Sequence, residues 1–184
     1  MTTRTAFLVI SFTLIISTSQ LLALAPGQTI ALKVTDLDGR TLSAADGQTT
    51  ILILTTRSDV DKARLVGDRT PDFCLGNPKF RMVTVIQFPK TTSRTIRFLF
   101  MATVRQRVNT EAKRLKVRYL KKKLTADPRQ DIHVAADFDG QMASQLGLPG
   151  AVTTFRVLIL GANGVLLREW TDVPSSQELD NALR

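Results

Sequence analysis

The sequence has few of the residues that most often bind metal ions or carry redox chemistry. Among its 184 residues there is one cysteine, Cys74, and one histidine, His133. A structural zinc site usually takes four Cys or His ligands, and an intramolecular disulfide takes two cysteines. Both are therefore excluded, and we expect neither a metal ion nor a cofactor. The Asp-x-Asp-Gly segments at 36–39 and 137–140 have too few oxygen ligands for calcium, so they predict turns.

Aromatic residues are scarce as well, at 6%, and acidic residues are outnumbered: 16 Asp and Glu stand against 25 Lys and Arg, a formal net charge of +9. Such a charge favours anionic partners. Nucleic acid is the least favoured of them, because few aromatic side chains are present to stack on bases. The hydrophobic content of 43% and the charged content of 22% are ordinary for a globular protein.

An apolar run occupies residues 6–16, and Arg4 is the only charged residue before Lys33. Small residues follow the run, as in a secretory signal peptide. We therefore expect residues 1–25 to direct export and residues 26–184 to form one periplasmic or secreted domain. Pro26 disfavours cleavage after Ala25, so retention of residues 1–25 as a membrane anchor is an alternative, and a buried N-terminal helix is another.

The remaining sequence alternates between short strand-like runs and helical segments. Turn residues at Asp38-Gly39 and Asn163-Gly164 each predict a β-hairpin, and the apolar run at 51–54 predicts a strand buried on both faces. We expect strands at 30–35, 40–43, 51–54, 82–88, 132–135, 155–160 and 165–170. We expect helices at 58–73, 91–124, 141–146 and 175–183. This order predicts an α/β fold with a mixed central sheet and helices on both faces.

Some local sequences are more specific than the order of elements. The stretch 146–159 contains Pro149-Gly150-Ala151-Val152-Thr153-Thr154-Phe155 before a strand, with Asp137-Phe138-Asp139-Gly140 ahead of it and Lys62-Ala63 after the first buried strand. Over most of residues 30–184 this resembles the thioredoxin-like superfamily, in particular its redoxin and peroxiredoxin-related exported proteins. The resemblance implies a thioredoxin-like sheet, an N-terminal hairpin, and a long basic helix at 90–125 inserted into the domain.

The resemblance fails at the positions that carry redox chemistry in that superfamily. The two thiols of a Cys-x-x-Cys pair would fall on Ser58 and Asp61. A peroxiredoxin-like Thr-x-x-Cys comparison places Thr55 on the Thr and Ser58 again on the Cys, and the loop proline falls on Val152. The site is therefore degenerate, and we expect no catalytic residue there. Ser58 and Asp61 are instead predicted to cap the following helix. A serine nucleophile is disfavoured, because the only histidine is predicted within a central strand.

Cys74 lies among apolar neighbours, in Asp72-Phe73-Cys74-Leu75, and is predicted to be buried and structural. The alternative is a working thiol that pairs with a cysteine of a partner protein. In that case the protein is a divergent redoxin with residual thiol–disulfide or peroxide chemistry, a thiol-dependent oxidoreductase.

Between Lys90 and Lys123 the sequence has twelve Lys and Arg residues and only one acidic residue, Glu111. We expect the densest part to bind anions through Arg107, Lys113, Arg114, Lys116, Arg118, Lys121, Lys122 and Lys123. One interpretation is a solvated helix face that keeps the protein soluble. The other is a surface for anionic lipid head groups or an envelope polyanion.

These observations favour an exported thioredoxin-like protein that lacks the redox cysteine pair. We expect it to act without catalysis, as a binding or scaffolding module at a membrane or envelope surface. A protein partner is a further expectation. The alternative is the divergent redoxin that works through Cys74.

Overall fold

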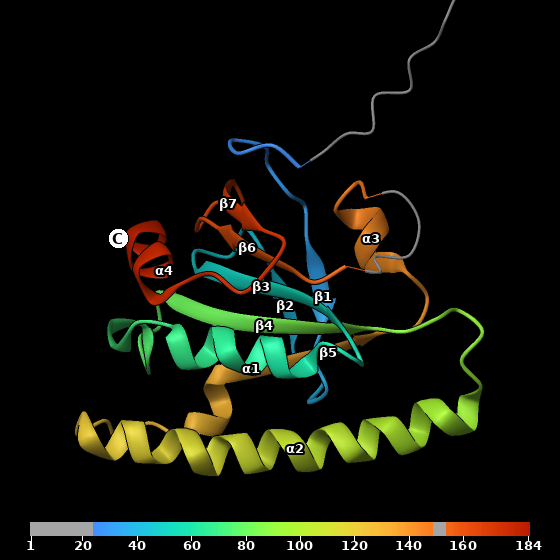
Figure 1. Ribbon diagram of the computed structural model, residues 1–184, viewed down its shortest axis with the longest axis horizontal. Helices are drawn as coiled ribbons and strands as arrows, with labels where there is room; N and C mark the ends of the chain where they lie inside the picture. The colour runs from blue at the N-terminus through green and yellow to red at the C-terminus, as the bar shows by residue number, and fades with distance from the viewer. Residues whose placement is uncertain (1–23, 149–153) are drawn as a thin grey trace, which may run out of the picture.

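The computed structural model describes residues 24–148 and 154–184, which include a five-stranded sheet in the order β5-β4-β3-β6-β7 and a two-stranded sheet, β1-β2 (Figure 1). Strands β3, β4 and β5 are parallel, whereas β6 and β7 are antiparallel to their neighbours. The sheet is therefore mixed, as predicted. The strands are β1 (Lys33–Thr35), β2 (Thr41–Ser43), β3 (Thr49–Thr56), β4 (Phe80–Gln87), β5 (Ile132–Asp137), β6 (Arg156–Leu160) and β7 (Leu166–Trp170).

Helices cover both faces of the five-stranded sheet. In Figure 1, α1 and α2 lie on one side of it, and α3 lies at its other side near β6. The α-helices are α1 (Val60–Arg69), α2 (Arg94–Lys121), α3 (Gln141–Gln145) and α4 (Ser176–Leu183), and the 3-10 helices are η1 (Asp72–Cys74) and η2 (Pro128–Asp131). This agrees with the predicted order of elements.

Strand β3 lies at the centre of the sheet and is buried on both faces. Leu52 and Leu54 belong to one buried cluster, and Ile51 and Ile53 belong to the cluster on the other face. Side chains alternate along a strand, so a run of four apolar residues fills both layers at once. The prediction of a doubly buried strand at 51–54 is confirmed, although the strand extends beyond this run at both ends.

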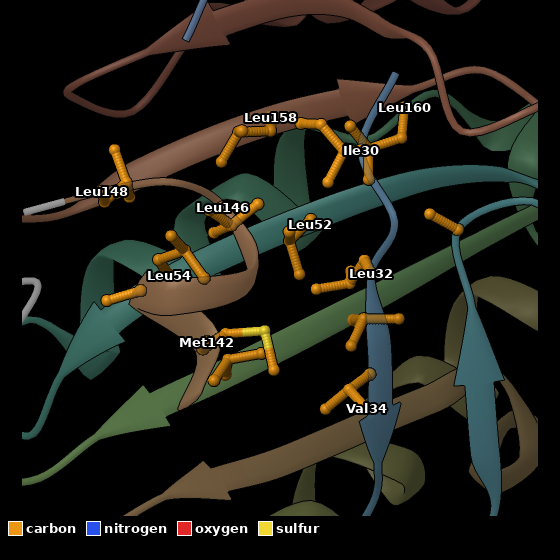
Figure 2. Packing of buried hydrophobic residues seen from close by; sticks show 14 of the residues in the cluster. Ile30, Leu32, Val34, Leu52, Leu54, Met142, Leu146, Leu148, Leu158 and Leu160 are labelled. Atoms are coloured by element: carbon orange, nitrogen blue, oxygen red, sulfur yellow. The ribbon is translucent and has the colours of Figure 1, made fainter. Parts of the chain in front are cut away.

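The β1-β2 hairpin and α3 pack together against one face of the sheet. Figure 2 shows Leu32 of the hairpin segment, Met142 of α3 and Leu52 of β3 directed into one apolar layer. The opposite face is covered by α1, α4 and α2. Val66 and Leu179, from α1 and α4, are fully buried there.

A buried carboxylate fastens the hairpin to the sheet. Asp36 accepts hydrogen bonds from the backbone N–H groups of Asp38 and Arg40, each at 2.9 Å, and His133 Nδ1 lies 3.1 Å from its Oδ2. Burial raises the pKa of the Asp36 carboxyl, but the hydrogen bonds from His133, Arg40 and Asp38 outweigh burial and hold that pKa below its usual value. The 36–39 segment is thus a turn, as predicted.

Backbone N–H groups from outside the five-stranded sheet donate hydrogen bonds to both of its outer strands. The Leu37 N–H donates to the Val134 carbonyl of β5 at 2.8 Å. At the other side of the sheet, the Gly27 N–H donates to the Leu166 carbonyl of β7, also at 2.8 Å. The hairpin and the residues before it therefore contact both outer strands.

The helix ends agree with the sequence in one case and differ in another. Ser175 caps α4 in a capping box with Glu178, at the start of the helix predicted over residues 175–183. Helix α1 ends at Arg69 rather than near Phe73, and Cys74 lies in the separate η1. The cause is Pro71, which cannot continue the helix.

Helix α2 is the longest described element and begins within the predicted range of 91–124, where Ser93 accepts from the Ile96 N–H. Apolar residues recur every three or four positions on one face of this helix: Val104, Val108 and Tyr119 are buried, whereas Ile96 is 53% exposed. The face therefore packs well only in its central and C-terminal parts. Of the helices in the described ranges, none combines the length and apolarity needed to cross a bilayer.

Candidate functional site

The turn after β3 contains hydroxyl and carboxylate groups where a thioredoxin-like site would have thiols. The Thr56 hydroxyl lies 2.8 Å from the Ser58 hydroxyl and donates to Asp59 at 3.0 Å. The predicted cap by Ser58 and Asp61 is wrong, because Ser58 is bonded to Thr56 and Asp59 and α1 begins only at Val60. Asp59 takes the cap position, but its side chain forms no capping hydrogen bond. Asp61 lies in the first turn, where its negative charge interacts favourably with the helix dipole.

Ser58 has no histidine within hydrogen-bond reach, because His133 is the only histidine of the chain and lies elsewhere in the sheet. His133 pairs with Val83 of β4, which in turn pairs with Leu52 of β3. His133 is therefore level with Leu52, which precedes Ser58 by six residues along the chain. The imidazole is bonded to Asp36 on the hairpin. A serine nucleophile needs a base within hydrogen-bond distance. The arrangement therefore gives Ser58 no histidine base, and its hydroxyl is bonded to Asp59 instead. Val152, the third degenerate position, lies outside the described residues.

Cys74 is 7% exposed and belongs to the cluster formed with α1 and α4. Burial, with a smaller contribution from the charge of Asp180, raises the pKa of the Cys74 thiol to about 11. Because the thiolate is the reactive form, a thiol with this pKa is a poor nucleophile at neutral pH. The prediction that Cys74 is buried is confirmed.

A cleft of about 1680 Å³ opens beside the turn, between α1 and β4 on one side and α2 on the other. Thr56 and Ser58 line it at the turn, and Cys74 lines it near η1. Its walls include the apolar side chains Val60, Ile86, Phe88, Ile96, Leu99, Phe100 and Val104.

Ion pairs hold α2 against α1 and η1 at one end of this cleft. Arg114 pairs with Asp68, and Arg118 donates to Asp72 at 2.8 Å and to the carbonyls of Gly67 and Thr70. Lys122 also binds Asp72 at 2.8 Å. Hydrogen bonds from Lys122 and then Arg118 hold the pKa of Asp72 below its usual value.

Tyr119 adds a buried contact at the same end. It is 1% exposed, and its hydroxyl donates to Asp131, which also accepts the Gly76 N–H at 2.8 Å. Burial raises the pKa of the Asp131 carboxyl; the Gly76 hydrogen bond and the charge of His133 oppose this rise without cancelling it. The end of α2 is thus fastened by both charge and packing.

Three of the eight predicted anion-binding residues are therefore already paired, namely Arg114, Arg118 and Lys122. The other five, Arg107, Lys113, Lys116, Lys121 and Lys123, form no ion pair with any described residue. The positive charge that stays available is smaller than the sequence alone suggests.

Two cleft residues were missed by the sequence analysis. Arg57 and Arg64 line the cleft together with Arg107, and neither forms an ion pair within residues 24–148 and 154–184. Both arginines lie outside the basic stretch at 90–123, so the density of Lys and Arg along the sequence did not predict a role for them. The acidic partners of Arg114 and Arg118 were easier to find from the sequence. Asp68 and Asp72 are four residues apart, as Arg114 and Arg118 are, and this matched spacing is typical of paired charges.

No protein-family model and no curated protein matches the chain. Solved structures do match. A putative thiol:disulfide interchange protein DsbE from Chlorobium tepidum is 14% identical over 88% of this chain and 96% of its own, with a TM-score of 0.52. MTB DsbF, in mixed oxidized and reduced forms, is 14% identical over 84% and 93%, with a TM-score of 0.51.

A putative thioredoxin from Neisseria meningitidis is 19% identical over 85% of this chain and 89% of its own, with a TM-score of 0.50. Identities this low show a shared fold rather than a shared activity. The chain therefore has a thioredoxin-like fold, as the sequence predicts. Its sequence contains a single cysteine, Cys74.

Proposed function

We propose that this thioredoxin-like domain is a binding module without thiol turnover, and that it works at an anionic surface of the cell envelope. The observation that carries the proposal is the state of its only cysteine. The turn after β3 holds Ser58 in place of a thiol, and Cys74 is buried with a pKa raised to about 11. A thiol that is neither accessible nor ionised supports no rapid exchange.

Basic residues in the last part of α2 and just after it, which form no ion pair with a described residue, support the second half of the proposal. Lys113, Lys116, Lys121 and Lys123 are all exposed. A basic residue near an anionic membrane contributes about 1 kcal/mol of attraction. The signal-like segment at 1–25 supports export to a place where such a surface is present.

Thiol-dependent turnover of the full chain tests the first half. Insulin disulfide reduction and peroxide consumption, each with a reductant, should not exceed the rate of a Cys74→Ser variant. Cys74 should also react slowly with a thiol probe until denaturant is added. Activity that disappears in Cys74→Ser, or rapid labelling of the folded protein, would overturn this half and favour the divergent redoxin.

Co-sedimentation with vesicles tests the second half. Binding to phosphatidylglycerol vesicles should exceed binding to neutral phosphatidylcholine vesicles and weaken as salt is raised. A Lys113→Glu/Lys116→Glu variant should bind the anionic vesicles less. Equal binding to both kinds of vesicle would contradict the proposal, and binding only to a soluble polyanion would replace the membrane by an envelope polymer.

A further inference from the structure

We propose that the cleft between α1 and α2 binds the acyl chain of an anionic amphiphile, whose charged head group contacts the arginines that line it. This ligand site is separate from the surface proposed above. Surface binding uses residues of α2 that point away from the domain, whereas the acyl chain would lie against the side of α2 that faces β4. Either proposal can fail without the other.

The size and shape of the cleft favour an extended ligand. Pockets for compact ligands are roughly 300–1,000 Å³, and this cleft has a volume of about 1680 Å³. Its lining residues on α2 extend from its cap, Ser93, to Arg118, which at about 1.5 Å per residue is on the order of 37 Å. A single acyl chain spans half of a bilayer core, about 15 Å. The cleft is thus long enough for one extended chain.

Some apolar side chains along the cleft are exposed to solvent. Ile96 and Leu99 both line it, and they are 53% and 60% exposed. Opposite them lie Ile86 and Phe88 at the end of β4, and Phe88 packs edge-to-face on Phe100 with ring centroids 4.3 Å apart. Exposed apolar residues gathered around a hollow are typical of a ligand groove. An acyl chain would remove this surface from water.

The charges around the cleft are unbalanced. Three carboxylates line it, and each already has a partner: Asp68 and Glu111 pair with Arg114, and Asp131 is bonded to Tyr119. By contrast, the lining residues Arg57, Arg64 and Arg107 are exposed and form no ion pair with a described residue. An arginine binds a carboxylate or phosphate through two parallel hydrogen bonds. The available charge is therefore complementary to an anionic head group.

Binding of cis-parinaric acid to the full chain tests the proposal, because the fluorescence of this polyene fatty acid rises in an apolar environment. We expect saturable binding that palmitate competes away and acetate does not. Among saturated fatty acids, affinity should rise about fourfold for each added methylene until the cleft is filled. Hexadecanol, with the same chain but no charge, should compete at least tenfold more weakly. No saturable binding, or equal competition by hexadecanol, would overturn the proposal.

Two matched pairs of variants locate the site. Leu99→Asp should weaken binding at least tenfold, whereas Phe98→Asp should not, because Phe98 is 74% exposed and does not line the cleft. Arg107→Glu should weaken binding, and Lys116→Glu, also exposed on α2 but outside the cleft, should not. All four positions are exposed, and circular dichroism will check that the variants stay folded. Equal effects within either pair would place the ligand elsewhere.

The same chemistry occurs in a free fatty acid and in a membrane lipid. Incubation of the protein with phosphatidylglycerol vesicles that contain palmitate, followed by its separation and mass spectrometry of bound lipid, distinguishes the two. Recovery of palmitate or of the phospholipid supports the proposal and names the source; recovery of neither overturns it. Lys113→Glu/Lys116→Glu should lower vesicle co-sedimentation and leave cis-parinaric acid binding unchanged.

Discussion

The two ends of α2 meet the rest of the protein in different ways. At the C-terminal end, Arg118 bridges to the end of α1 and to η1, and Tyr119 is buried against Asp131. Near the N-terminal end, Arg97 pairs with Asp139, but Ile96 and Leu99 are more than half exposed, and Arg107 in the middle of the helix forms no ion pair with a described residue. The helix is thus fastened more extensively at its C-terminal end, and it opens onto a cleft ahead of that end.

This difference indicates that two parts of one long helix can have different roles. Its C-terminal end has acidic partners at matched spacing, so its charges stabilise the fold. Ahead of that end, Ile96 and Leu99 are apolar side chains that remain more than half exposed, which costs stability unless a ligand covers them. Four variants test this difference by their effect on stability, and they are given from the largest expected effect to the smallest.

Tyr119→Ala should destabilise the protein most. It removes a buried aromatic ring and the donor to Asp131, and truncations of this kind cost about 3–5 kcal/mol. Urea denaturation followed by circular dichroism measures the loss. Tyr119→Phe keeps the ring and should cost only about 1 kcal/mol. A loss below about 1 kcal/mol for Tyr119→Ala would mean that this end is not fastened.

Arg118→Met should have an intermediate effect. Methionine retains an apolar stem but loses the hydrogen bonds to the Gly67 and Thr70 carbonyls and to Asp72. Because Arg118 is partly exposed, we expect a loss of about 1–2 kcal/mol in the free energy of unfolding. The measurement is again urea denaturation, and an unchanged midpoint would contradict the role given to this side chain.

The ion pairs of Asp72 should give a small dependence of stability on pH. Hydrogen bonds from Lys122 and Arg118 lower the pKa of Asp72 in the folded state, so the unfolded state binds the proton more readily. The stabilisation is therefore present above the ordinary Asp pKa of about 4 and is lost as pH falls below it. Thermal denaturation between neutral pH and acid should show a shallower decline for Asp72→Asn than for the natural chain. Equal slopes would contradict this assignment.

Arg107→Met should have the smallest effect on stability. The side chain is exposed and forms no ion pair within the described ranges, so the free energy of unfolding should stay within about 0.5 kcal/mol of the natural value. This variant is the control for Arg118→Met in the same denaturation series. A large loss would show that the middle of α2 is held as firmly as its C-terminal end, which the contacts do not indicate.

The sequence predicted most of the fold because the relevant signals are local. Residues 51–54 identify the central strand, Asn163-Gly164 the last hairpin, and Ser175 with Glu178 the start of α4. The helical cap at Ser58 failed, because Thr56 and Asp59 compete for that hydroxyl once the chain turns. Even there the observed cap position, Asp59, differs from the predicted one by a single residue.

The candidate site was less predictable because it depends on how far α2 lies from α1 and β4. Counting charges along 107–123 overestimated the free basic surface, since Asp68 and Asp72 neutralise part of it from another element. The same count omitted Arg57 and Arg64, which reach the cleft from the turn after β3 and from α1. Burial of Cys74 was predictable from its apolar neighbours.

The contacts of the segment before β3 have a consequence for self-association. In a sheet, the outermost strands expose unpaired backbone groups that can recruit another chain. Here Leu37 binds the Val134 carbonyl on β5, while Gly27 and Gln28 exchange hydrogen bonds with Leu166 on β7. One stretch of chain thus shields part of both sheet edges. This shielding lowers the tendency toward edge-to-edge aggregation without adding a strand to the sheet.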